Sequence, residues 1–526
     1  MIRVRQIKVG VLEDSQEVLL KKISQKLKIN VSDILFYEIR KKSIDARDKE
    51  NIIYVYEFNV KVKEEGKVLK KITSPDIFLW DEKEYTFPKP PEGIPLIKQP
   101  IIVGSGPAGL FCAYFLAEAG YCPRIFERGD SMEERIQSVE EFFKGGVLDP
   151  NSNVQFGEGG AGTFSDGKLN SLVKDKMGRM RKIFEIFVEN GAPEEILYMH
   201  NPHIGTDLLR NVIISIRKKI LSMGGEFHYR SCVTNLLISH DQITGIEVNH
   251  KELYSSNCVI LAIGHSARDT FQMLHENGIL MKPKNFAVGV RVEHPRSMID
   301  TWQYGKFAST LGAAPYKLTY QTKSGRGVYS FCMCPGGFVV NASSEEEGIV
   351  VNGMSNYNRD EANSNSAIVV SISPEDLGGE LFSGMEFQRQ LEQAAYREGN
   401  GLIPVQLYKD FKKNQVSTGY GSFSSNTMGS AFFGNLRNVL PPFISESILE
   451  AMPEFGKKIH GFDREDTIFL GVETRTSSPV VIERDEHYMS SIKGLYPCGE
   501  GAGYAGGITT SAIDGLKVAE EIVLNS

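Results

Sequence analysis

The sequence predicts an α/β fold built on a parallel sheet, with an inserted mixed α+β domain and a small α+β domain at the N-terminus. Three observations predict it: an apolar run followed by spaced glycines and a helix, a second apolar run in mid-chain, and a strand, turn and helix at the end. Short apolar runs of this kind are typical of strands buried on both faces of a parallel sheet. We therefore expect these distant segments to meet in one domain.

The first of these segments is IIVGSGPAGLFCAYFLAEAGYCPRIFE, from Ile101 to Glu127. Gly104, Gly106 and Gly109 follow the strand in G-x-G-x-x-G spacing, and Glu127 ends the next strand. Such glycines permit a tight turn, the approach of a pyrophosphate and close helix packing, while the helix N-terminus attracts the anion. The carboxylate of Glu127 can bind ribose hydroxyls. The sequence therefore predicts a dinucleotide-binding site here.

The composition of the chain limits the kinds of partner that it can bind. The chain has 526 residues, of which 41% are hydrophobic, so it can form several domains with substantial cores. Its net charge of −7 offers no broad attraction to nucleic acid or anionic membrane, and no apolar run reaches the about 20 residues of a membrane helix. The cysteines form no C-x-x-C pair, which favours a reducing compartment. We expect a cytoplasmic protein that acts on a small molecule, with no nucleic-acid or membrane partner; no pattern indicates an oligomeric state.

The predicted domains follow changes in pattern along the chain. Residues 1–95 are expected to form the N-terminal α+β domain, and the proline-rich segment Lys89 to Pro100 to link it to the next. Within the first domain, the basic segment from Arg40 to Arg47 is predicted to be a solvated turn. Residues 96–281 are the first part of the nucleotide domain, with a glycine-rich excursion over 131–225; residues 282–459 are the inserted domain, and residues 460–526 complete the nucleotide domain.

The excursion contains QFGEGGAGTFSDGKLNS, from Gln155 to Ser171. Glycine at this density indicates a loop whose N–H groups approach the nucleotide, and Thr163, Ser165 and Lys168 could contact phosphate. The alternative is a flexible surface loop. The apolar residues spaced along it, such as Phe164 and Leu169, argue against that alternative.

The order of motifs resembles a known superfamily. A glycine loop, an acid after the second strand, a mid-chain strand ending in A-x-G at Gly264, and a last strand ending in Gly499-Glu500 resemble the glutathione reductase-type flavoproteins, in the branch with one nucleotide-binding domain. The stretches FGEGGAGTFSDGKL, HIGTD and FCMCPGG and the N-terminal segment resemble a bacterial family of poorly characterised FAD-dependent dehydrogenases. The chain departs from the superfamily in carrying Ile263 for its usual Thr and Glu500 for its usual Asp.

The resemblance implies a Rossmann-like FAD-binding domain and a role for several residues. The pyrophosphate would lie on the glycine loop, the adenosine ribose on Glu127, the adenine on the backbone of Val233, and the ribityl chain near Glu500. The turn at Gly264 would lie beside the isoalloxazine, and Gly507-Ile508 beside its pyrimidine. The residues predicted to bind FAD are Gly104, Ser105, Gly106, Pro107, Ala108, Gly109, Glu127, Arg128, Gly162, Thr163, Phe164, Ser165, Lys168, Leu169, Val233, Gly264, Gly499, Glu500, Gly507 and Ile508.

The predicted function is that of an FAD-dependent oxidoreductase, a dehydrogenase passing a hydride or electron pair between the flavin N5 and a small organic substrate under the inserted domain. No separate second dinucleotide-binding domain is evident in the sequence, so NAD(P)H is a candidate only as a diffusible electron donor. Two alternatives stay open: a flavin-dependent RNA-modifying enzyme, and a non-catalytic FAD-binding protein.

The catalytic candidates are His265, Arg291, Cys332, Cys334 and Arg475. His265 could relay a proton or be structural. The two arginines could bind an anionic substrate or form structural ion pairs. The C-x-C pair could form a redox disulfide or bind a substrate thiol, although packed cysteines are the favoured interpretation. No metal site is predicted.

Overall fold

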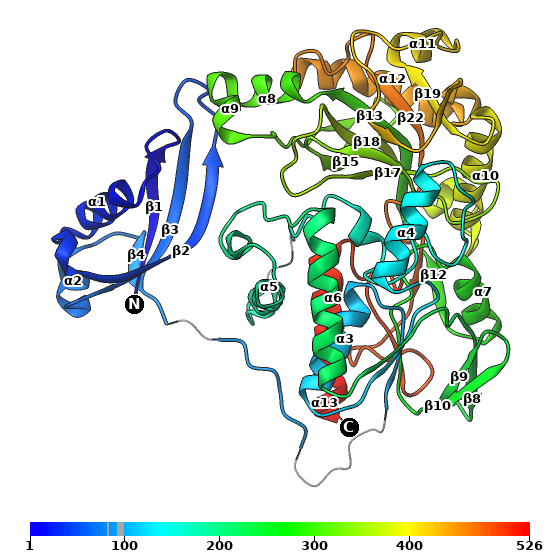
Figure 1. Ribbon diagram of the computed structural model, residues 1–526, viewed down its shortest axis with the longest axis horizontal. Coiled ribbons are helices and arrows are strands. Elements are labelled where there is room, and N and C mark those ends of the chain that lie inside the picture. Colours follow the sequence, from blue (N-terminus) through cyan, green and yellow to red (C-terminus); the bar gives the residue numbers. More distant parts are fainter. Residues whose placement is uncertain (82–83, 92–98, 172, 174, 526) are drawn as a thin grey trace.

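The computed structural model describes residues 1–81, 84–91, 99–171, 173 and 175–525. The structure has three parts: a small N-terminal sheet, a parallel-sheet domain, and a larger mixed sheet whose strands are inserted into the chain of the parallel-sheet domain (Figure 1). The predicted α/β class, with a Rossmann-like domain, is confirmed. The predicted linker from Lys89 to Pro100 falls largely outside the described residues. Within the described part of the chain, no helix has both the length and the apolar character needed to cross a membrane.

The N-terminal domain is an antiparallel sheet in the order β2-β3-β1-β4. Its elements are β1 (Ile2–Gly10), α1 (Gln16–Leu27), β2 (Ile34–Asp45), β3 (Ile53–Val62), α2 (Glu65–Lys71) and β4 (Ile77–Leu79). Helix α1 begins after Ser15, whose hydroxyl accepts the Val18 N–H at 3.4 Å. Its buried residues Leu19, Ile23 and Leu27 recur at the spacing of one helix face, so the helix packs on the sheet.

Strand β2 docks this domain against the rest of the molecule. The Lys42 N–H donates to the Tyr198 carbonyl at 2.8 Å, and the His200 N–H donates to the Lys42 carbonyl at 2.9 Å. The Lys42 ammonium pairs with Asp14 at 2.8 Å. The prediction of a solvated turn from Arg40 to Arg47 is therefore wrong for its first half, because β-pairing with a segment far along the chain cannot be read from local charge.

The second domain is a parallel sheet in the order β24-β11-β5-β6-β7. Its strands are β5 (Ile101–Val103), β6 (Arg124–Phe126), β7 (Glu226–His228), β11 (Val259–Leu261) and β24 (Leu495–Pro497). One hydrophobic core joins the sheet to α3 (Pro107–Glu118), α5 (Arg179–Glu189), α6 (Thr206–Ser222) and α13 (Ile508–Asn525). A Cβ on Gly109 would lie 2.0 Å from the Gly104 carbonyl oxygen, so only glycine lets α3 begin this close to the turn after β5.

The other face of the sheet carries a second core. It is covered by a three-stranded sheet, β8 (Val233–Ser239), β9 (Gln242–Val248) and β10 (Glu252–Ser255), and by α7 (Arg268–Glu276). Helix α4 (Met132–Phe143) opens the glycine-rich excursion. The carboxyl ends of β5, β6, β11 and β24 thus meet at one edge, where a doubly covered parallel sheet binds its ligand.

The third body, here called the cap, is a seven-stranded sheet in the order β14-β15-β18-β13-β22-β19-β21. Its strands are β13 (Phe286–Pro295), β14 (Thr319–Gln321), β15 (Gly327–Cys334), β18 (Asn363–Ile372), β19 (Ile403–Leu407), β21 (Ala431–Phe433) and β22 (Ile468–Glu473). A smaller sheet holds β16 (Phe338–Asn341), β17 (Val351–Met354) and β20 (Thr427–Met428). The helices are α8 (Arg296–Tyr304), α9 (Ala308–Leu311), α10 (Ser383–Glu398), α11 (Tyr408–Lys413) and α12 (Pro442–Lys458).

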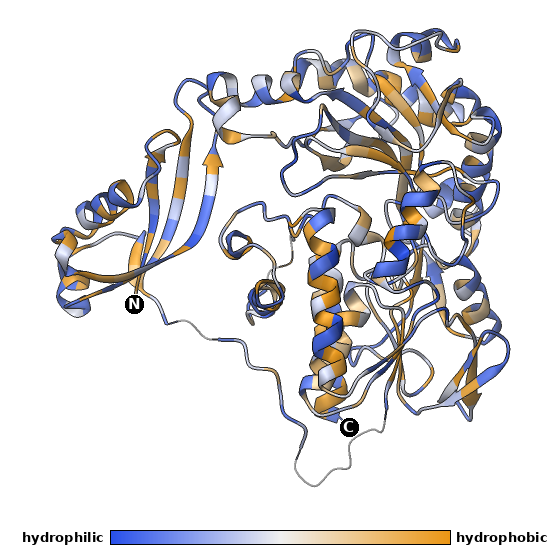
Figure 2. Cartoon of the chain, in the orientation of Figure 1, coloured by the Kyte–Doolittle hydropathy of each residue, from blue (hydrophilic) through white to orange (hydrophobic). Residues whose placement is uncertain are grey.

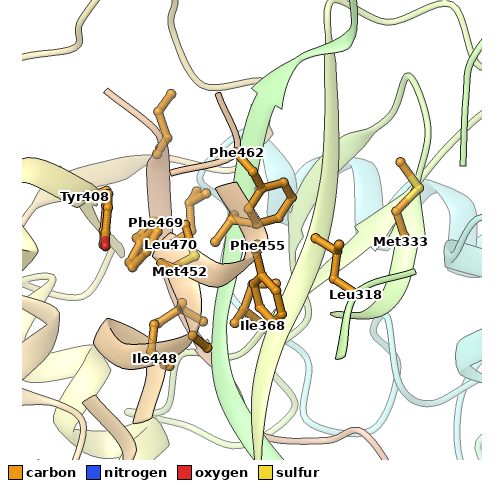
Figure 3. Packing of buried hydrophobic residues seen from close by; sticks show 14 of the residues in the cluster. Leu318, Met333, Ile368, Tyr408, Ile448, Met452, Phe455, Phe462, Phe469 and Leu470 are labelled. Atoms are coloured by element: carbon orange, nitrogen blue, oxygen red, sulfur yellow. The ribbon is translucent and has the colours of Figure 1, made fainter. Parts of the chain in front are cut away.

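The cap has a core of its own, to which helix α12 contributes Phe455, the loop after it Phe462, and strand β22 Phe469 (Figure 3). The strands of the cap are largely apolar in Figure 2, as expected for a sheet with buried faces. Strand β22 pairs with β13 and β19 inside this sheet. The predicted boundary at residue 459 is therefore wrong: the cap extends past β22, because strand pairing and not chain order decides which domain a strand joins. The ribbon of β12 (Met281–Pro283) and β23 (Val480–Ile482) connects the cap to the parallel-sheet domain on both sides.

Candidate functional site

A cavity of about 370 Å³ lies between the carboxyl edge of the parallel sheet and the cap. This volume is within the range of pockets that hold cofactors and small ligands. Its wall comes from the glycine turn after β5, the end of β6, the glycine-rich excursion, the turn after β11, the cap strands β15, β17 and β22, and the start of α13. Segments between Val103 and Ser511 thus enclose one space.

The glycine turn after β5 is shaped for close approach of a ligand. Gly104 has φ +97°, and a Cβ there would lie 2.4 Å from the Ala262 carbonyl oxygen. Gly106 is the N-cap of α3 and makes no side-chain cap, so the helix N-terminus is open to an anion. Across the cavity, a Cβ on Gly264 or Gly507 would meet no atom within 4 Å, so both glycines border open space. These features fit a dinucleotide pyrophosphate.

Glu127 borders the same cavity, and its carboxylate is tightly held. One oxygen accepts the N–H and hydroxyl of Ser105 at 2.9 and 2.8 Å. The other accepts the N–H groups of Gly129 and Gly157 at 3.0 and 3.1 Å. These donors occupy the about four acceptor sites of a carboxylate, so Glu127 joins three loops around the cavity.

The end of the cavity near Glu127 is lined by Arg128 and Val233. The Arg128 guanidinium lies over the Phe156 ring at 4.5 Å and donates to Asp269 at 2.8 Å. This stacking orients a flat cationic group along the wall. The arrangement suits the adenosine half of a dinucleotide, since a flat base can lie between such a group and the backbone of β8.

The opposite end of the cavity holds Glu500 and the start of α13. Burial raises the pKa of Glu500 to about 7, and the Lys284 ammonium partly opposes this rise. Lys284 itself donates to the Gly503 carbonyl at 3.0 Å, which fixes its position. The first turn of α13 contributes Ile508 and Ser511 to the wall. A helix N-terminus at this place favours negative charge on a ligand.

His265, a catalytic candidate, lines the cavity beside Gly264. Its Nδ1 and the Ser266 hydroxyl lie 2.8 Å apart. Burial, assisted by the positive charges of Arg475 and Arg268, lowers the pKa of His265 to about 4. The imidazole is therefore neutral at physiological pH, and it can donate or accept a hydrogen bond there without carrying charge.

Arg475 borders the cavity, but its guanidinium is committed to a buried ion-pair group. It donates to both oxygens of Glu392 at 3.1 and 2.8 Å. Arg268, from the other domain, binds the same two oxygens at 2.8 and 2.9 Å. Although burial alone would raise it, the two arginines lower the pKa of Glu392 to about 2. This geometry supports the structural interpretation of Arg475: one carboxylate on α10 joins the cap to α7.

Arg291 is likewise paired and does not reach the cavity. It donates to both oxygens of Glu473 at 2.8 and 2.9 Å, and to the Asn365 side chain at 2.7 Å. Its exposed fraction is 0%. Of this pair, Glu473 is the member that lines the cavity.

The cavity brings together most of the residues predicted from sequence. Those in its wall are Gly104, Gly106, Pro107, Ala108, Glu127, Arg128, Gly162, Ser165, Lys168, Val233, Gly264, Glu500, Gly507, Ile508, His265, Cys332 and Arg475. Those outside the wall are Ser105, Gly109, Thr163, Phe164, Leu169, Gly499, Arg291 and Cys334.

Three of the residues predicted to contact FAD lie outside the cavity wall for a physical reason. Phe164 and Leu169 are buried in hydrophobic cores, and Thr163 is fully buried behind the loop. The apolar residues of the excursion anchor its glycines and do not themselves reach the ligand space. Sequence reasoning also missed wall residues, among them Gln155, Asp166, Asn352 and Thr476. Gln155 and Asp166 stand within the glycine-rich stretch, which was a usable signal. The cap residues Asn352 and Thr476 had no such signal.

The fold and the cavity define a dinucleotide-binding flavoprotein. Residues 285–476 match the model of an FAD-dependent protein, C-terminal domain-like, and residues 102–156 match that of an NAD(P)-binding Rossmann-like domain. Residues 1–61 match a domain of unknown function. An uncharacterized protein of Clostridium beijerinckii is 46% identical over 530 residues, covering 99% of this chain and 98% of that protein. The chain belongs to the same family as this protein, and it is an FAD-dependent oxidoreductase with FAD as its cofactor.

Solved structures with a low similarity to this chain include two enzymes. Glycine oxidase from Bacillus cereus is 11% identical with a TM-score of 0.34, covering 80% of this chain and 96% of that one. L-proline dehydrogenase from P. horikoshii is 13% identical with a TM-score of 0.32, covering 81% and 93%. Among the described residues, no group of three or more His, Cys, Asp or Glu side chains could hold a metal ion.

Proposed function

We propose that the chain is a dehydrogenase of the single-nucleotide-domain branch, which passes a hydride or electron pair between the flavin and a small organic substrate held under the cap. When bound, FAD supplies the two-electron chemistry. One observation carries this proposal: the cavity runs without a break from the glycine turn after β5 to the cap strands, where Glu473, Thr476 and Cys332 line it. A substrate at the cap end would lie next to the redox-active part of the cofactor.

The protein would hold each part of FAD with different groups. The glycine turn and the N-terminus of α3 would bind the pyrophosphate through N–H groups. Glu127 and Arg128 would hold the adenosine half, and Glu500 the ribityl chain. The N-terminus of α13 would stabilise the negative charge of the reduced flavin. The neutral His265 would offer a hydrogen bond beside the flavin without adding charge.

A second cavity, of about 560 Å³, adjoins the first and shares Phe331, Thr476 and Gly506 with it. Lys284 and Arg326 lie in its wall, and Arg326 is paired with Asp376 at 2.5 Å. We propose this space as the route by which a substrate, or NAD(P)H as a diffusible donor, reaches the flavin. Its polar and aromatic wall, with Phe286 and Tyr329, suits a small molecule with an aromatic or amide group.

Anaerobic mixing with NADH deuterated at C4 tests hydride transfer. The purified protein, with its FAD content measured after denaturation, is mixed with NADH, with NADPH and with each deuterated donor, and the flavin absorbance is followed. We expect bleaching by one nicotinamide, slowed several-fold by deuterium. A flavin that dithionite reduces but neither nicotinamide does would remove NAD(P)H as donor. A reduced flavin that no organic acceptor reoxidises faster than oxygen would argue against a dehydrogenase.

A further inference from the structure

Two thiols stand where strand β15 reaches the cavity. Cys332 lies in the cavity wall, and Cys334 is fully buried behind it. Met333, between them, faces the opposite way and packs with Leu318 in the cap core (Figure 3). Both cysteines therefore lie away from the core of the cap, and Cys332 borders the ligand space.

The backbone at this place is specialised. Cys332 has φ 43°, a left-handed conformation that a non-glycine residue seldom adopts. From Phe331 to Cys334 the strand carries one residue more than its neighbour β18, which runs only from Ala367 to Asn365. Such a bulge re-aims side chains and is common beside active sites. Strain held at one residue of a cavity wall is typical of functional positions.

The bulge also brings the two sulfurs together. In a regular strand, residues two apart have Cα atoms about 6.6 Å apart, near the upper limit for a disulfide. Here the bend at Cys332 brings the two side chains near enough to interact. The Cys334 Sγ also lies 3.4 Å from the Cys332 carbonyl oxygen. The neighbouring strand leaves room for this pair, because a Cβ on Gly353 would lie 2.7 Å from the Cys334 Sγ.

The surrounding charges make the two thiols unequal. The interaction with the Cys334 side chain lowers the pKa of Cys332 to about 6. The positive charges of Lys168 and Arg291 also lower this pKa, whereas burial and Glu473 oppose the fall. The same interaction and burial raise the pKa of Cys334. Two further carboxylates face the pair, Glu500 across the cavity and Asp166, which is paired with Arg359. At neutral pH the pair therefore holds one thiolate, on the cavity side, and one thiol.

We propose that Cys332 and Cys334 form a redox-active thiol pair that exchanges two electrons with FAD in this cavity. In the oxidising direction an S–S bond forms between the two sulfurs, and the thiol of Cys334 loses its proton. The two electrons and that proton go to FAD, which becomes the singly protonated reduced anion; the reverse step restores the thiolate and the thiol. The proposal rests on FAD binding in the cavity. It replaces the prediction, made from the sequence, that these cysteines are only packed.

Reductive titration of the FAD-loaded protein tests the pair. The protein is oxidised with excess oxidised dithiothreitol, desalted, and titrated anaerobically with dithionite, with FAD content measured first. We expect four electrons per FAD for the parent, and two each for Cys332→Ser and Cys334→Ser. Cys122→Ser, which removes an exposed thiol, is the control and should take up four. An uptake of two electrons by a parent with full FAD content would overturn the redox-active thiol pair and leave the proposed function standing. A parent that binds no FAD would overturn the proposed function as well.

Thiol chemistry gives a readout that does not depend on the flavin. In the oxidised parent, the peptide spanning both cysteines should be lighter by two hydrogens and resist iodoacetamide. In the reduced parent, alkylation of Cys332 should rise with a midpoint near pH 6. Cys334→Ala removes the interacting thiol, so its midpoint should move up by at least one pH unit, while Cys334→Ser should restore part of the shift. An unchanged midpoint in Cys334→Ala, or no disulfide in the oxidised parent, would overturn the proposal.

Discussion

Glu392 offers a direct test of how the cap is joined to the nucleotide domain. Its carboxylate lies between Arg268 and Arg475 and is 1% exposed. Glu392→Gln keeps the shape of the side chain but leaves two buried guanidinium groups without a counter-charge. Removing one partner of a buried pair costs about 3 to 5 kcal/mol.

The pKa of Glu392 gives an independent magnitude. Its fall from 4.5 to about 2 corresponds to about 3 kcal/mol of preference for the charged form in the folded protein. Because the folded pKa is depressed, this stability is present above pH 4.5 and is lost as the pH falls toward 2. The two arguments agree on a loss of about 3 kcal/mol at neutral pH.

Urea unfolding, followed by fluorescence of Trp302 in the cap and by far-UV circular dichroism, measures this loss. Glu386→Gln is the matched control, since Glu386 lies on the same helix in an exposed ion pair with Arg389 at 3.0 Å. We expect a change within about 0.5 kcal/mol for the control. The difference between Glu392→Gln and the parent should narrow as the pH is lowered through 4.5. A Glu392→Gln protein as stable as the control at pH 7 would refute the reasoning.

Three further predictions concern the cavity. Gly106→Leu should lose FAD, measured as flavin retained after gel filtration, because a side chain at the α3 N-cap blocks the pyrophosphate, whereas Gly66→Leu on α2 should keep it. Glu127→Ala should weaken the binding of FAD by about 1 to 3 kcal/mol and leave FMN, which has no adenosine, relatively favoured. Equal FAD affinity of the variant and the parent in a fluorescence titration would contradict the proposed contact between Glu127 and the adenosine half. Burial raises the pKa of Glu500 to about 7 in the folded protein, so the parent should lose stability as the pH rises and this carboxyl ionises. The melting temperature of Glu500→Gln relative to the parent should therefore increase between about pH 5 and 8. A relative gain that shrinks over this range would be inconsistent with a buried carboxyl.

The nucleotide domain could be predicted because its signals are local. The glycines from Gly104 to Gly109 and the acid at Glu127 stand at fixed spacing along the chain, and the turn between β5 and α3 needs them there. The cap could be recognised only as an inserted domain. Which of its residues reach the cavity depends on strand pairing over long separations, such as β13 with β22, and on the bulge at Cys332. No local spacing encodes either, so Asn352 and Thr476 could not be found and the cap boundary was placed before β22.

The closing strand and helix, β24 and α13, have a consequence for biosynthesis. Strand β24 pairs with β11, and Gly515 of α13 lies so close to α3 that a Cβ there would be 2.1 Å from the Ala108 carbonyl oxygen. During translation, the first βαβ unit therefore waits for β24 and α13 before this side of its helix is covered. The cavity can be enclosed only after α13 has been made, because the first turn of that helix forms part of its wall. A protein shortened by one terminal helix would leave the apolar side of α3 open to chaperones and proteases.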